Sequence, residues 1–177
     1  MMRSDILNVN SGSYQEYINQ NVTVHSATSA LDATGIDADH KIITSGVLAA
    51  AITLPQATAA NAGMVIDIII SAAVASDGTC LVGFADAGST VFVGSLITSI
   101  SLGTAAKEAT GTSITTSAKR VVLDSNSVAT AGGGIGSWYR CIYTKLNQVF
   151  VFGVGIVTGT TATDVDATCS TTTGVDG

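Results

Sequence analysis

Short apolar runs separated by turn-forming residues constrain this fold more than any other feature of the sequence. From residue 40 onward the runs are rich in Ile, Val and Thr, and Gly, Asp, Ser or Asn stand between them. β-Branched residues favour strands, and regular short strands with such punctuation indicate a sandwich or barrel rather than alternating β and α units. We therefore predict one all-β domain over residues 31–160.

The strongest predicted strand runs from Met64 to Ile70 and is apolar on both faces. Because successive side chains of a strand point to opposite faces, both sides of this strand should be covered. Asp67 interrupts one face, and an unpaired buried carboxylate is costly. We expect Asp67 at a wet edge of the sheet or hydrogen-bonded at a subunit contact.

Further strands are predicted at 41–44, 51–54, 79–84, 90–94, 96–102, 120–124, 137–145 and 148–157, and residues 104–110 can host a helical turn.

The last two long runs are joined by a tight polar connection at residues 144–147, which predicts an antiparallel β-hairpin. This hairpin holds five of the nine aromatic residues of the chain. Aromatic side chains bury large areas, so we place the centre of the core here. The five are Trp138, Tyr139, Tyr143, Phe150 and Phe152.

The two ends of the chain are polar and differ from the domain between them. Residues 1–30 are rich in Asn and Ser around Tyr14 and Tyr17, and we predict an N-terminal arm. A tail lying on its own domain and an arm reaching to another chain both fit this composition. Residues 161–177 are rich in Thr and Gly, which predicts an extended C-terminal arm or a frayed tail.

The charge balance argues against two classes of partner. Thirteen acidic residues against seven basic ones give a net charge of -6, and Lys119–Arg120 is the only adjacent basic pair. Nucleic-acid backbones and anionic membranes both attract clustered cations, so we expect neither as a partner. The first residues do not form a signal peptide, and the most apolar run is too short for a membrane helix. We expect a soluble protein made in a cytoplasm.

The three cysteines, Cys80, Cys141 and Cys169, are far apart in the sequence. They show no C-x-x-C spacing and no His-rich partner segment, so a disulfide framework or a zinc site is not expected. Cys80 and Cys141 fall within apolar runs. We interpret both as small buried apolar residues.

No catalytic residue, cofactor site or metal site is predicted. His25 and His40 lie near no motif that would make either a base, and no G-x-S-x-G elbow is present. Residues 37–40 begin like a calcium loop but lack its Gly and closing Glu, which favours a solvated turn. Residues 132–136 are Gly-rich but lack the G-K-[ST] ending of a phosphate loop, so we predict a hairpin loop there.

Two stretches carry a family resemblance. Residues 51–66 contain a strand, Leu-Pro, an Ala/Thr turn, Asn-x-Gly and a second strand, and residues 136–153 contain a Gly-led strand, a polar turn and an aromatic strand ending in Gly. Both resemble segments of tailed-bacteriophage virion proteins, including capsid decoration proteins and fibre domains. The chain departs from the pattern at residues 146–148, where an Asp-Gly-type turn is common, and by carrying Trp138 on the first strand of the hairpin.

The resemblance implies an antiparallel, jelly-roll-like β-sandwich that self-associates, often as a trimer, on the capsid exterior. We expect a non-enzymatic capsid decoration or cement protein that binds the major capsid protein in the virion after synthesis in the host cytoplasm. Tyr14 and Tyr17 are the expected partner-binding residues, since Tyr is enriched at interfaces. The alternative is a head- or tail-fibre module that binds a host receptor.

Overall fold

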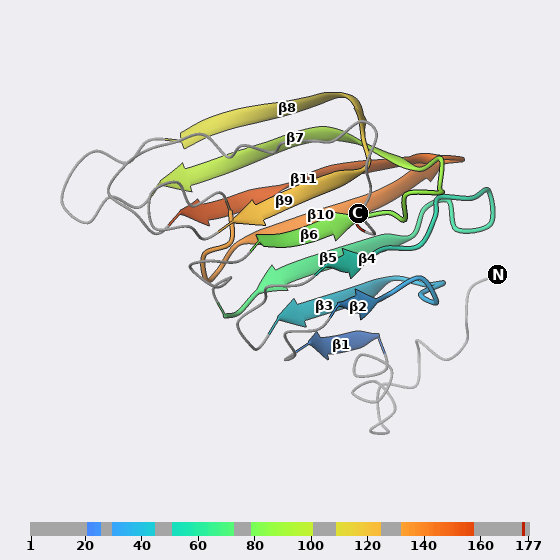
Figure 1. Cartoon of the computed structure of the whole chain (residues 1–177), viewed down its shortest axis with the longest axis horizontal. Helices are drawn as coiled ribbons and strands as arrows, with labels where there is room; N and C mark the ends of the chain where they lie inside the picture. The colour runs from blue at the N-terminus through green and yellow to red at the C-terminus, as the bar shows by residue number, and fades with distance from the viewer. Residues whose placement is uncertain are drawn as a thin grey trace, which may run out of the picture.

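The computed structural model describes residues 21–25, 30–44, 51–72, 79–100, 109–124 and 132–157, together with Val175. These residues form eleven strands and no helix, so the prediction of an all-β chain is confirmed for them (Figure 1). None of the described segments is a helix long and apolar enough to cross a membrane.

The strands form two sheets (Figure 1). The larger sheet has the order β1-β3-β5-β10-β11-β7-β8, with bounds β1 (Val22–His25), β3 (His40–Thr44), β5 (Val65–Ile70), β10 (Trp138–Lys145), β11 (Gln148–Val157), β7 (Val91–Ile100) and β8 (Ala109–Ala118). The smaller sheet has the order β2-β4-β6-β9, with bounds β2 (Leu31–Asp32), β4 (Ile52–Thr53), β6 (Thr79–Gly83) and β9 (Arg120–Asp124).

The first six strands alternate between the two sheets. β1, β3 and β5 lie side by side in the larger sheet, while β2, β4 and β6 lie side by side in the smaller one. Each full turn of the chain returns to the same sheet in the same direction, so these neighbours pair in parallel. A jelly roll is built from antiparallel strands. The prediction of an antiparallel, jelly-roll-like path is therefore wrong for this part of the chain.

The last two long strands form the predicted antiparallel hairpin, which inserts between β5 and β7. Its turn contains Asn147 at φ 60°, a left-handed conformation that Asn tolerates better than most residues. The Asn147 carbonyl accepts a hydrogen bond from the Val91 N–H at 3.1 Å, and its own N–H donates to the Ala57 carbonyl at 3.0 Å. These bonds fix the turn of the hairpin against two other segments.

Two predicted elements differ from the structure. The runs at 90–94 and 96–102 belong to one strand, β7, whose pairing with β8 shifts register between Phe92 and Gly94. Gly94 has φ 140°, and a Cβ there would collide with the Val151 carbonyl oxygen, so this position requires Gly. β8 was not predicted, and its first two residues overlap the segment 104–110, so the prediction of a helical turn is wrong at residues 109 and 110.

The core is shared by both sheets. The larger sheet contributes Ile42, Ile66 and Ile68, and the smaller sheet contributes Ile52, Val82 and Leu123, all at most 4% exposed. Phe84 and Phe92 pack with ring centroids 4.6 Å apart. Of the five hairpin aromatics, only Tyr139 and Tyr143 are in this core. The prediction that the hairpin aromatics form the centre of the core was therefore wrong for Trp138, Phe150 and Phe152.

The ends of the chain contribute two described features. β1 lies within the segment predicted as an N-terminal arm and pairs with β3 at the edge of the larger sheet. Val175, within the predicted C-terminal arm, is buried, and its N–H donates to the Phe84 carbonyl at 3.0 Å. Tyr14, Tyr17 and the start of the possible helical turn at 104–110 lie outside the described residues.

Candidate functional site

The outer face of the larger sheet is the surface that points away from the core. Alternate residues of its central strands lie on it, because their neighbours in sequence are buried against the smaller sheet. We define this outer face by the four central strands. Its residues are Val65, Asp67 and Ile69 of β5, Trp138, Arg140 and Ile142 of β10, Phe150, Phe152 and Val154 of β11, and Val93, Ser95 and Ile97 of β7.

Three aromatic rings form the centre of the outer face. The ring centroids of Trp138 and Phe152 are 5.7 Å apart in an edge-to-face arrangement, and those of Phe150 and Phe152 are 5.9 Å apart. Phe150 is 38% exposed, and further along the same two strands the paired Val154 and Ile97 are 36% and 50% exposed. Contiguous exposed apolar side chains on a sheet face are typical of a binding surface.

An ion pair crosses the outer face between β5 and β10. Arg140 donates from Nε to Oδ1 of Asp67 at 2.6 Å and from Nη2 to Oδ2 at 2.8 Å, and the two residues are opposite each other in register. These hydrogen bonds raise the pKa of the Arg140 guanidinium above its usual value, so the group stays a cation. Asp67 is thus paired within the chain. The prediction of a wet edge was wrong, because β5 lies inside the sheet between β3 and β10. The alternative, a hydrogen bond at a subunit contact, stays a prediction.

The guanidinium of Arg140 also contacts the aromatic centre. Its Cζ lies 5.4 Å from the centroid of the Trp138 ring, within the range of a cation–π interaction. Arg140 therefore joins the aromatic part of the outer face to the carboxylate of Asp67. The side chain of Arg140 is 39% exposed, so it is available to a partner as well.

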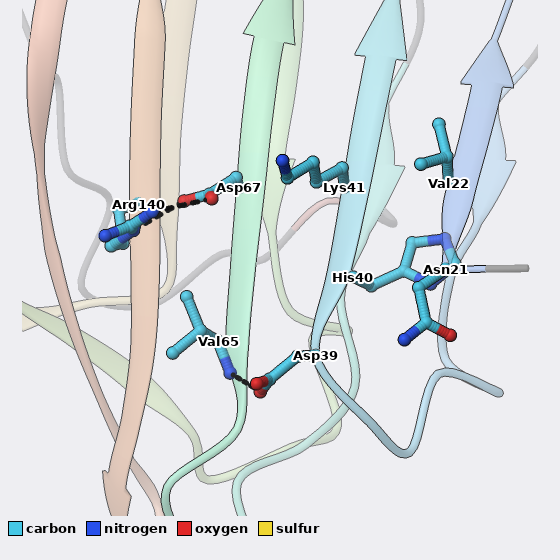
Figure 2. A pocket seen from close by; sticks show the side chains of 8 residues that line it. All are labelled: Asn21, Val22, Asp39, His40, Lys41, Val65, Asp67 and Arg140. Carbon is cyan, nitrogen blue, oxygen red and sulfur yellow. Dashed lines mark hydrogen bonds and ion pairs between the residues drawn. The ribbon is translucent and has the colours of Figure 1, made fainter. Parts of the chain in front are cut away.

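A groove of about 400 Å³ borders the outer face where β1, β3 and β5 lie beside β10 (Figure 2). Asp39 and Val65 line its lower part in this view, and Asp67 and Arg140 line the side of β5 and β10. The full lining is Asn21, Val22, Asp39, His40, Lys41, Val65, Asp67 and Arg140.

Backbone and side-chain hydrogen bonds hold the groove in place. Oδ1 of Asp39 accepts a hydrogen bond from the Val65 N–H at 2.9 Å, which ties the residue before β3 to the start of β5. Nε2 of His40 lies 2.7 Å from Oγ1 of Thr23 and so links β3 to β1. Burial lowers the pKa of His40 below its usual value, so the ring is neutral at pH 7.

The structure also places the other residues weighed from the sequence. Cys141 is buried, as predicted, and burial raises its thiol pKa to about 12. The side chain of Cys80 and all of Cys169 lie outside the described residues. Gly132 and Gly134 are buried, Ile135 and Gly136 form an exposed turn before β10, and the Tyr139 hydroxyl donates to the Gly132 carbonyl at 2.6 Å. Among the described residues, no three His, Cys, Asp or Glu side chains gather as a metal site would require.

Sequence reasoning assigned the hairpin aromatics to the core and therefore missed the outer face. The alternation of side chains along the hairpin strands could have revealed this face. Trp138, Phe150 and Phe152 point away from the side of the sheet on which Tyr139 and Tyr143 lie.

Comparison with protein-family models, curated proteins and solved structures finds no match to the chain. The residues of the site are therefore the main basis for a functional proposal.

Proposed function

We propose that this chain is a non-enzymatic structural protein of a phage virion, a decoration protein that binds the outer surface of the major capsid protein lattice and stabilises the head. The observation that carries the proposal is the partly exposed aromatic surface around Phe150 and Phe152 on the outer face. Trp, Arg and aromatic residues are the types that contribute most to protein interfaces. The resemblance of residues 51–66 and 136–153 to phage virion proteins supplies the context.

The distribution of charge supports docking through the larger sheet. Its seven strands contain three cations, Lys41, Arg140 and Lys145, and one anion, Asp67, while the whole chain has a net charge of -6. The rest of the molecule therefore carries the negative charge. Among the described strands, an acidic partner surface would therefore meet the least electrostatic repulsion at the larger sheet.

Assembly into a larger unit completes the proposal. We propose that the two sheets form a β-sandwich, that the chain assembles as a homotrimer, and that Tyr14 and Tyr17 contribute further contacts to the capsid. Three copies bound together multiply the effect of one weak contact through effective concentration. After synthesis in the host cytoplasm, the protein acts on the capsid exterior.

Co-sedimentation with purified capsids tests the proposal. We expect saturable binding at a fixed ratio to the major capsid protein, and Phe150→Glu should weaken it at least about tenfold because it places a charge in the apolar surface. Leu146→Glu is the matched control, since Leu146 is 61% exposed in the hairpin turn, away from the outer face. Absence of capsid binding by the unmodified protein would refute the decoration role, and binding to a host glycan without capsid binding would favour the fibre module.

A further inference from the structure

The groove at β1, β3 and β5 has a chemistry different from that of the aromatic surface beside it. Six of its eight lining residues are polar or charged. The strand register places Lys41, Asp67 and Arg140 in one row across β3, β5 and β10. Figure 2 shows Lys41 between the Asp67–Arg140 pair and Val22. A volume of about 400 Å³ lies in the usual range for small-ligand sites.

Several hydrogen-bonding groups of the groove have no partner among the residues that the structure describes. Within the described part of the chain, the Lys41 ammonium makes no hydrogen bond or ion pair, and neither does the side-chain amide of Asn21. Arg140 uses Nε and Nη2 for Asp67, which leaves Nη1. Asp39 uses Oδ1 for the Val65 N–H, which leaves Oδ2. Donors and acceptors therefore stand close together.

The charges in the groove cancel. Lys41 and Arg140 are positive, Asp39 and Asp67 are negative, and the pKa of His40 keeps its ring neutral at pH 7. A phosphate or carboxylate ligand would meet two carboxylates, and a cationic ligand would meet two cations. An apolar ligand would leave the polar groups unsatisfied. A neutral molecule with several hydroxyl groups suits all of them, because each hydroxyl both donates and accepts hydrogen bonds.

We propose that this groove binds a neutral saccharide, with Lys41 and Asp39 hydrogen-bonding its hydroxyl groups and Arg140 closing one side. This site goes beyond the decoration role and needs no capsid. Trp138 is the only tryptophan of the chain and contacts Arg140, so its fluorescence reports on occupation of the groove. The site is open, and we expect weak binding to a single sugar chain.

A printed array of bacterial surface polysaccharides and neutral oligosaccharides tests the site with the isolated full-length protein. The strongest neutral oligosaccharide is then titrated while Trp138 fluorescence is recorded. Lys41→Ala and Asp39→Asn should each lower affinity at least about tenfold, the expected effect of losing one charge-assisted hydrogen bond. Asn at position 39 can still accept the Val65 N–H, so the second variant keeps the local fold.

Matched controls separate the groove from general charge effects. Lys145→Ala removes the same charge as Lys41→Ala, from an exposed position that does not line the groove, and Asp37→Asn repeats the Asp39 change outside the groove. Both controls should bind like the unmodified protein. No binding to any neutral glycan, binding that Lys41→Ala and Asp39→Asn leave unchanged, or binding confined to acidic glycans or peptides would each overturn the proposal. Capsid co-sedimentation is scored separately, so the two proposals can fail independently.

Discussion

The two faces of the β10–β11 hairpin carry similar side chains in different surroundings. On the inner face, Tyr139 and Tyr143 are at most 4% exposed, whereas Phe150 and Val154 on the outer face are 38% and 36% exposed. The inner side chains share a core with the smaller sheet, and the outer ones have no layer of described residues over them. Large apolar side chains in a strand therefore do not by themselves identify the core. Which alternate set is covered decides whether they stabilise the fold or form a binding surface.

The largest expected effect comes from the inner face. Tyr143→Ala removes a fully buried ring and the hydrogen bond from its hydroxyl to the Pro55 carbonyl, so we expect a loss of about 4 kcal/mol in the free energy of unfolding. Urea denaturation measures the change. Tyr143→Phe is the control and should lose about 1 kcal/mol, the value of one hydrogen bond. Equal losses for the two variants would contradict the packing of this ring.

The ion pair on the outer face should show an unequal response to removal of its two partners. Arg140→Ala leaves the nearly buried Asp67 carboxylate unpaired and should cost about 2 kcal/mol in unfolding free energy. Asp67→Ala leaves the more exposed guanidinium, which water can solvate, and should cost about 1 kcal/mol. Urea denaturation of both variants measures which one loses more unfolding free energy. A larger loss for Asp67→Ala would mean that the carboxylate is better solvated than the structure indicates.

On the aromatic surface, stability and binding should separate. Phe150→Ala should change the free energy of unfolding by at most about 1 kcal/mol, because the ring is 38% exposed and leaves no closed cavity. The same variant should weaken capsid binding clearly in co-sedimentation. Val24→Ala, at an exposed position of the edge strand β1, provides a control of similar polarity. A stability loss as large as that of Tyr143→Ala would place Phe150 in a core.

The smallest expected effect is a pH dependence at the groove. The folded pKa of His40 lies below its unfolded value because burial disfavours the charged ring. The unfolded chain then binds the proton more readily, so this contribution to stability is present above the unfolded pKa and is lost as pH falls below it. Urea midpoints of the unmodified protein and of His40→Gln, measured from pH 7.5 to 5, should approach each other toward the acid end. A constant difference between the two urea midpoints across this pH range would contradict the lowered pKa of His40.

Much of the strand pattern could be predicted from the sequence, because it is local. Short apolar runs between turn-forming residues identified the strands that became β5 and β9, and the polar connection at 144–147 identified the β10–β11 hairpin. β8 was missed because its sequence, ATGTSITTSA, holds a single large apolar residue and a Gly. Its backbone pairing with β7 makes it a strand, although its own residues favour a strand only weakly.

The parallel coiling of the first six strands and the functional residues could not be predicted in the same way. Whether β3 and β5 pair in parallel depends on the chain crossing to the smaller sheet between them, which no local pattern records. The partner of Asp67 lies 73 residues away at Arg140, so only the sheet order brings them together. Lys41 joins this pair for the same reason.

Side-chain footprinting of the protein bound to capsids tests the outer face most directly as the binding surface. Hydroxyl radicals oxidise exposed aromatic and aliphatic side chains, and mass spectrometry reads the extent at each residue. We predict that Trp138, Phe150 and Phe152 are protected on binding, while Leu146 in the hairpin turn keeps its reactivity. Unchanged oxidation of the three rings, with protection elsewhere on the molecule, would contradict the outer face as the docking surface.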